Sequence, residues 1–221
     1  MQEILDHLAS LSNESTYAHN TKYGATNQYG VKLGDIRQVA KSTKKDKQLA
    51  ISLWETGIAD AQLLATLIVN PKQLSLDEVD EMVRTINFSQ VADWFSAYLL
   101  KDRTDKRLLY DQWIESDNKW AQRAAWNLLS GFIARNTENI NLDVILKDIE
   151  KNMSSAAPEI QWTMNTALAQ IGIHHEAYRE QALSIGEKLG VYRDYPVSKG
   201  CTSPFAPIWI NEMVSRKNNK A

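Results

Sequence analysis

The chain has 221 residues, 43% of them hydrophobic and 24% charged, which is enough apolar material for one large globular domain or two small ones. No long apolar run occurs, so a membrane span is not expected, and a single cysteine excludes an internal disulfide and fits a reducing cytoplasm. The net charge of −2 lacks the basic excess of most duplex-binding proteins, although a local basic stripe on one face can still act.

The N-terminal residues 1–7 are acidic and amphipathic. A basic start followed by an apolar block is missing, so we expect no signal peptide. Further along, the basic run at residues 41–47 also contains Asp46, a mixture typical of a solvated helix end.

Apolar residues recur at helical spacing between sparse glycines and prolines. The runs lie at residues 49–54, 63–68, 88–99, 126–133 and 160–171. Long strand-type alternation is absent, so we expect an all-α chain of about ten to twelve helices joined by short turns.

A faint repeat accompanies these runs, because four glutamines each fall near the start of an expected helix: Gln62, Gln90, Gln122 and Gln161. Their unequal separations approach the roughly 40-residue period of paired-helix solenoids of the HEAT type. Such pairs stack into a curved superhelix with a concave surface. We therefore expect one HEAT-like α-solenoid domain over residues 1–221, with a non-repeat helical bundle as the alternative.

A polar break between two helical patterns is surrounded by three tryptophans and one arginine: Trp113, Trp120, Arg123 and Trp126. The break predicts a helix–turn–helix corner in which Asn118 or Asp117 caps the second helix. Arg123 shares one helical surface with two of the tryptophans. It is either a phosphate or cation site or an arginine packed against rings, and the tryptophans themselves are more typical of a core.

The segment 191–207 holds three of the five prolines and cannot be a regular helix. Its aromatic residues predict packing against the helical body, with a small polar site or a plug over the concave face as alternatives. A terminal helix is expected at 208–217. Cys201 near Lys199 leaves thiolate chemistry as a remote option. The four histidines lack metal-ligand spacing, so neither a metal site nor a cofactor is expected.

The corner at 116–125 closely resembles a segment of the bacterial HEAT-repeat alkylpurine DNA glycosylases, the AlkD-like DNA alkylation repair family. Residues 29–37, 53–60 and 87–93 fit the same family in the same order, and the resemblance runs from about Gly30 to Leu168. The C-terminal segment around Cys201 looks like a feature of one divergent branch of these proteins.

This resemblance implies a protein that binds double-stranded DNA, damaged or branched, on a concave basic surface and excises cationic N3- or N7-alkylated purines. Family members place a carboxylate to stabilise the sugar cation and an arginine to hold the neighbouring phosphate. Carried over, Asp93 is the catalytic carboxylate. The DNA-binding residues implied here are Arg123, Trp162, Trp120, Lys32 and Arg37.

The match departs from the family pattern at two tryptophan positions, where Ser89 and Thr166 stand. Trp162 lies one helical turn before Thr166 and is the natural substitute. Trp94 points about 100° away from Asp93 on a helix and is a poor one. The alternatives are therefore a non-catalytic binder of DNA structures or a protein-interaction scaffold, with Asp93 as a capping acid or an ion-pair partner of Arg123.

Overall fold

The structure is a computed structural model that describes residues 1–135 and 140–219. These residues form thirteen α-helices and short 3₁₀ and π segments, and their only extended pairing is an isolated bridge between Ser12 and Val31. The all-α prediction is confirmed, with slightly more helices than expected. The chain divides into two compact units, Met1–Leu109 and Tyr110–Ala221.

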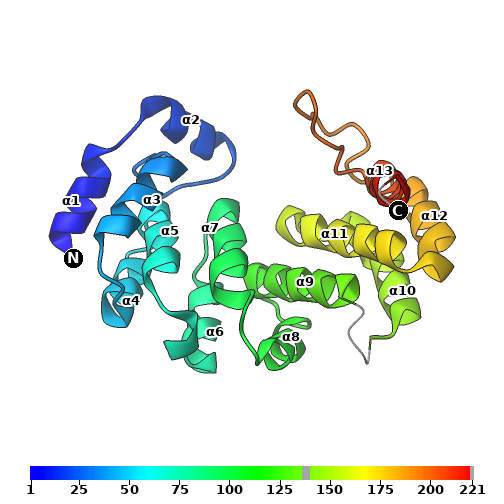
Figure 1. Ribbon diagram of the computed structural model, residues 1–221, viewed down its shortest axis with the longest axis horizontal. Coiled ribbons are helices and arrows are strands. Elements are labelled where there is room, and N and C mark those ends of the chain that lie inside the picture. Colours follow the sequence, from blue (N-terminus) through cyan, green and yellow to red (C-terminus); the bar gives the residue numbers. More distant parts are fainter. Residues whose placement is uncertain (136–139, 220–221) are drawn as a thin grey trace. The chain divides into compact units, whose positions relative to one another are not determined.

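Unit 1 is built around α5, whose residues are almost all buried and which packs against α3, α4 and α7 (Figure 1). Its helices are α1 (Gln2–Ser10), α2 (Glu14–Lys22), α3 (Leu33–Ser42), α4 (Lys47–Glu55), α5 (Ala59–Ile68), α6 (Leu76–Arg84) and α7 (Ser89–Trp94). A 3₁₀ turn covers Pro71–Gln73, and a π-helix at Phe95–Leu100 continues α7.

Unit 2 is built around the long helices α9 and α11, which share the most extensive helix–helix contact of the chain's described residues. The boundary between the units falls inside α8 (Lys106–Trp113). The other helices are α9 (Lys119–Ala134), α10 (Leu142–Asn152), α11 (Pro158–His174), α12 (Arg179–Leu189) and α13 (Ala206–Asn218). Two 3₁₀ turns cover Met153–Ser155 and Glu176–Tyr178.

Three of the four repeated glutamines make the same hydrogen bond. Each is the fourth residue of its helix, in α5, α9 and α11, and its Nε2 donates to the backbone carbonyl eight residues earlier, at the end of the preceding helix. The bonds join Gln62 to Trp54 at 3.3 Å, Gln122 to Ile114 at 3.2 Å and Gln161 to Met153 at 2.9 Å. The repeat is therefore a shared turn in which the glutamine amide ties the start of one helix to a backbone carbonyl at the end of the preceding one. Two of these carbonyls, those of Trp54 and Met153, also accept a backbone N–H. Gln90, the second residue of α7, stands in another register.

Side-chain caps set several helix starts. Asn118, and not Asp117, caps α9, because its Oδ1 accepts from the backbone N–H groups of Trp120 and Ala121 at 3.0 and 3.1 Å. Ser75 and Glu78 form a reciprocal capping box at the start of α6.

Helix α13 packs closely on α11 and α12 because two glycines leave room for it. A Cβ added to Gly172 in α11 would lie 2.5 Å from the Ile210 side chain, and one added to Gly186 in α12 would lie 2.7 Å from Pro207. The helix begins at Ala206, two residues before the expected range of 208–217.

The segment 191–207 contacts the helical body at its two ends. At one end the Tyr192 ring packs on Trp162, and at the other Phe205 is buried and Asn165 Nδ2 donates to the Pro204 carbonyl at 2.8 Å. Residues 193–201 between these anchors are exposed. Tyr195 is the exception among them, because its ring also packs on Trp162, with the centroids 5.7 Å apart. The predicted packing against the body thus describes the anchors and Tyr195 and not the rest of the segment.

Candidate nucleic-acid interface

Helix α7 presents Asp93 to solvent and turns Trp94 inward. Asp93 is exposed, whereas Trp94 keeps only 5% of its surface exposed. Successive helical residues differ by about 100° in direction, so the predicted divergence of the two side chains is seen. The apolar neighbours of Asp93 in sequence point into unit 1, and its carboxylate lies at the surface.

Arg37 of α3 lies over the Trp94 ring. Its guanidinium carbon is 4.5 Å from the ring centroid, and Nη1 makes a long hydrogen bond of 3.5 Å to the Leu33 carbonyl. Tyr98 contacts the same indole edge-on at 5.4 Å. A guanidinium stacked on a ring keeps its N–H groups around its rim, where they can donate to a phosphate. Unit 1 thus brings Arg37 next to the helix that carries Asp93.

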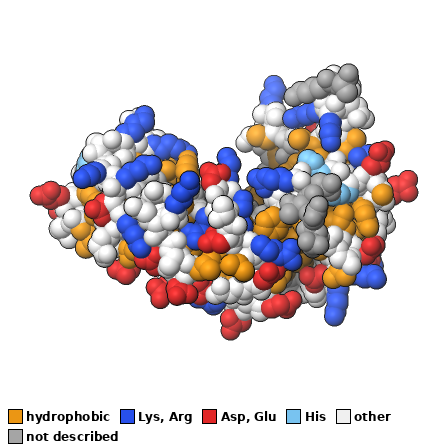
Figure 2. Space-filling model, turned by 60° about the horizontal axis from the view of Figure 1, so that its bottom comes forward, with side chains coloured by type: hydrophobic (Ala, Val, Ile, Leu, Met, Phe, Trp, Pro, Cys, Tyr) orange, Lys and Arg blue, Asp and Glu red, His pale blue; other side chains and the backbone are white. Residues whose placement is uncertain are grey.

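The surrounding stretch of unit 1 is locally basic. Residues 22–45 contain six basic side chains and one acidic side chain, Asp35. All six basic residues are exposed: Lys22, Lys32, Arg37, Lys41, Lys44 and Lys45. In the view of Figure 2, Lys and Arg lie mainly over the upper part of unit 1, and Asp and Glu lie at its end and along its lower edge. The chain's net charge of −2 therefore hides a basic region of the kind that attracts polyanions.

Small polar residues stand at the two positions where the family's tryptophans are expected, and they lie in different surroundings. Ser89 is the half-buried first residue of α7. The Thr166 hydroxyl donates to the Trp162 carbonyl at 2.9 Å within α11. Neither position supplies a ring, and the Trp94 indole that follows Asp93 in sequence is buried and covered by Arg37.

In unit 2, Arg123 is a buried side chain with a backbone partner. It is 5% exposed, and its Nη1 donates to the Glu159 carbonyl at 2.8 Å, which ties α9 to the first turn of α11. This burial leaves little of the guanidinium for a ligand. A phosphate contact by Arg123 stays a prediction, and the geometry favours a positioning role.

An ion pair covers this junction. Lys119 Nζ lies 2.6 Å from the Glu159 carboxylate and 5.1 Å from the centroid of the Trp120 ring. Burial acts to raise the pKa of Glu159, but hydrogen bonds and the charges of Lys119 and Arg123 outweigh it and hold this pKa below its usual value. Trp120 is 6% exposed, and Trp113 and Trp126 are buried as well. Trp126 belongs to the hydrophobic core cluster of unit 2.

Trp162 is half-buried under two tyrosines of the 191–207 segment. The three rings of Trp162, Tyr192 and Tyr195 lie with their centroids 5.2 to 5.7 Å apart. Tyr192 has a φ of 63°, a left-handed conformation that costs a non-glycine residue about 1 kcal/mol or more. Burial raises its pKa to about 12, against the opposing charge of Arg123. The sequence showed aromatics in this segment without showing that they meet Trp162.

Asp93 belongs to unit 1 and Arg123 to unit 2. The expectation that both face one hollow stays a prediction. In the described ranges 1–135 and 140–219, no group of three His, Cys, Asp or Glu residues is arranged to hold a metal ion. No helix there is long and apolar enough to cross a membrane.

Comparison with known proteins gives one family match and several relatives. A family model described as DNA alkylation repair enzyme matches residues 4–198. The uncharacterized protein Lin0241 of Listeria innocua is 23% identical over 218 residues, 96% of each chain. The uncharacterized protein Lmo0209 of Listeria monocytogenes is 23% identical over 217 residues, 95% of each chain.

A solved structure covers 98% of this chain and 94% of its own, with a TM-score of 0.77 and 23% identity. It is described as a new family of proteins related to the HEAT-like repeat DNA glycosylases with affinity for branched DNA structures. At this identity the likeness concerns the fold, and it confirms the HEAT-like prediction.

Proposed function

Because this chain belongs to the DNA alkylation repair enzyme family, we propose that it binds DNA through the basic surface of unit 1 around α3 and α7. The observation that carries this proposal is the exposed guanidinium of Arg37, held over Trp94 in the stretch of six exposed basic residues. Phosphate contacts dominate the affinity of proteins for DNA, and a pre-positioned arginine makes the stronger ones.

The other predicted DNA-binding residues receive roles from their surroundings. Lys32, exposed immediately before α3, contributes a second phosphate contact. Trp162 offers an aromatic face to an unstacked base or sugar after the tyrosines move aside. Arg123 holds the start of α11, and thereby Trp162, in place, while Trp120 lies under Lys119, which pairs with Glu159 of the same turn.

Branched DNA is the preferred form in this proposal. The solved relative is described as having affinity for branched structures, and its fold extends over nearly the whole of this chain. DNA junctions also present phosphates and unstacked bases. The basic side chains of unit 1 can bind the phosphates, and the Trp162 ring can stack on a base.

The binding test measures fluorescence anisotropy with linear, nicked and four-way DNA of matched length. Arg37→Met should weaken binding about tenfold and reduce the salt dependence by about one released counterion, because one phosphate contact is lost. Arg84→Met is the matched control, since Arg84 is an exposed arginine of the same unit paired with Asp80. Equal weakening by both substitutions would mean that only net charge matters, and the assigned site would be wrong.

Excision of cationic alkylated purines is the second candidate function, favoured by the exposed position of Asp93 on α7, the helix on which Arg37 packs through Trp94. A carboxylate at this surface can stabilise the positive charge that develops on the sugar when a cationic base leaves. The absence of rings at Ser89 and Thr166 weighs toward binding without excision. Release of 7-methylguanine from methylated duplex, compared between wild type and Asp93→Asn, decides between them. Release that persists unchanged in the variant contradicts a catalytic Asp93, and no release from either leaves the binding function alone.

A further inference from the structure

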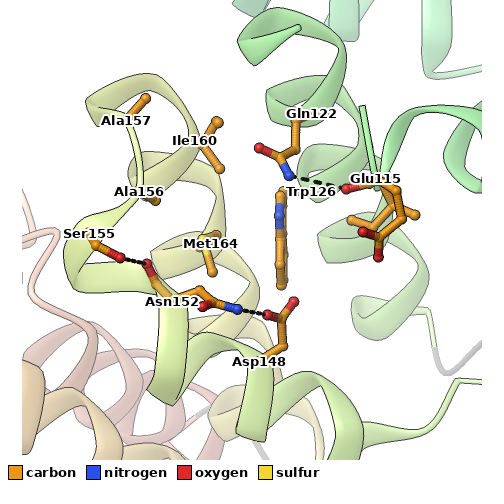
Figure 3. Close-up of a pocket in the computed structure, with 11 residues that line it drawn as sticks. Glu115, Gln122, Trp126, Asp148, Asn152, Ser155, Ala156, Ala157, Ile160 and Met164 are labelled. Atoms are coloured by element: carbon orange, nitrogen blue, oxygen red, sulfur yellow. Dashed lines mark hydrogen bonds between the residues drawn. The ribbon is translucent and has the colours of Figure 1, made fainter. Parts of the chain in front are cut away.

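A cavity of about 300 Å³ lies in unit 2, walled by residues of α9, α10 and α11 and by the turn after α8 (Figure 3). It borders Gln122 and Trp126 of α9 and Ile160 and Met164 of α11. None of the predicted DNA-binding residues lines this cavity. Its volume is at the lower end of the range for small-molecule sites.

The charged lining of the cavity is entirely acidic. Glu115 and Asp148 line it, and no lysine or arginine does. Among the residues that the structure describes, no ion pair or hydrogen bond is found for the Glu115 carboxylate. Two carboxylates without a basic neighbour in the wall favour a positively charged occupant.

The amide and hydroxyl donors at the rim are already used within the protein. The Gln122 amide donates to the Ile114 carbonyl, the Asn152 amide to Asp148, and the Ser155 hydroxyl to the Asn152 carbonyl. What the rim leaves available is mostly acceptors, namely carboxylate and amide oxygens. A ligand rich in N–H donors therefore complements it.

The indole of Trp126 supplies a flat wall. It is 3% exposed, and Figure 3 shows it between Glu115 on one side and Ile160 and Met164 on the other, with Asp148 below. The side chain is almost wholly buried and borders the cavity. An indole face attracts cations, and the neighbouring isoleucine and methionine suit an alkyl chain.

We propose that this cavity binds a small organic cation, an alkylammonium or alkylguanidinium, with its charge at Glu115 and Asp148 and its alkyl body against Trp126. The same chemistry is found in a free diamine or guanidine and in the arginine side chain of a protein. A phosphate does not suit this cavity, because the two carboxylates repel it.

Calorimetric titration at fixed ionic strength tests the proposal with agmatine and spermidine, and with the neutral N-butylurea as the uncharged comparison. We expect dissociation constants of about 1 mM or tighter for the cations and at least tenfold weaker binding of the neutral compound. An acetylated and amidated arginine tripeptide distinguishes the sources: tighter binding of the peptide identifies a protein side chain, and tighter binding of agmatine identifies a free small molecule.

The variant Glu115→Gln with Asp148→Asn keeps the shape of the cavity and should weaken cation binding at least tenfold. The matched control, Glu187→Gln with Glu212→Gln, removes two acids of unit 2 that do not line the cavity and should change binding less than twofold. Thermal unfolding verifies that both variants are folded. Absence of cation binding to wild type, or equal binding to wild type and the cavity variant, would overturn the proposal whatever the result with DNA.

Discussion

Arg37 in unit 1 and Arg123 in unit 2 were both expected to hold DNA phosphates, and they lie in opposite environments. Arg37 is exposed and rests on the Trp94 ring, whereas Arg123 is buried and donates to the Glu159 backbone carbonyl. Both lie close to tryptophans, yet one is available to a ligand and the other joins two helices. An arginine close to tryptophans in sequence can therefore either face solvent, where it can bind a ligand, or be buried and bond to the protein backbone.

Removing each guanidinium in turn should affect the stability of the protein to different extents. Arg123→Met should lower the free energy of unfolding by about 2 kcal/mol, because a buried charge-assisted hydrogen bond is lost. Arg37→Met should cost about 0.5 kcal/mol, the typical value of an exposed cation–π contact. Urea unfolding followed by circular dichroism measures the free energy of unfolding of both variants. Equal decreases would show that the two arginines contribute to stability in the same way.

A second, smaller effect comes from Tyr192 in unit 2. Its pKa is raised from the ordinary 10.0 to about 12, so the folded state favours the neutral phenol. This contribution is fully present below pH 10 and is lost as the pH rises through about 12, and after allowance for solvent screening it is about 1 kcal/mol.

Phenolate absorbance during an alkaline titration measures the effect. The wild type should contain a late-titrating component near pH 12 that is missing in Tyr192→Phe. Tyr195→Phe is the control and should retain that component. A wild-type titration without it would mean that the ring is not buried against Trp162.

The smallest expected effect concerns the ion pair that covers Arg123. Glu159→Gln should cost about 0.5 kcal/mol at neutral pH, since the partner Lys119 is 48% exposed. The pKa of Glu159 is lowered in the fold, so its stabilisation exists above the unfolded value of 4.5 and disappears as the pH falls through the folded value. Unfolding of both proteins at neutral and acidic pH measures this, and a difference that persists in acid would exclude the ion pair as its cause.

The sequence predicted the local features of the fold well. Helical spacing predicted an all-α chain, the glutamine repeat corresponds to the shared turn bond, and Asn118 was one of two expected caps. These features depend on residues less than ten positions apart, where helical geometry fixes the relation between side chains. The start of α13 was missed by two residues, because Pro207 fits the first turn of a helix as readily as the end of a loop.

The candidate site was predicted less completely, because its contacts join distant parts of the chain. Arg37 of α3 packs on Trp94 of α7, and Tyr192, which follows α12 in the sequence, packs on Trp162 of α11. Arg123 donates to a backbone carbonyl, which every residue possesses, so the residue types in the sequence could not reveal this contact. The sequence did not predict that Asp93 is exposed, since its neighbours in sequence are apolar. These neighbours point in other directions on the helix.

The seating of α13 on Gly172 and Gly186 has a consequence for synthesis on the ribosome. Ile210 and Ala206 belong to the same buried cluster as Trp126 and Met164, so unit 2 lacks part of its interior until these late residues emerge. Unit 1 contains its own interior within the first half of the chain. Nascent unit 1 can therefore close early, while nascent unit 2 keeps an apolar surface open to chaperones until translation has passed Ile210.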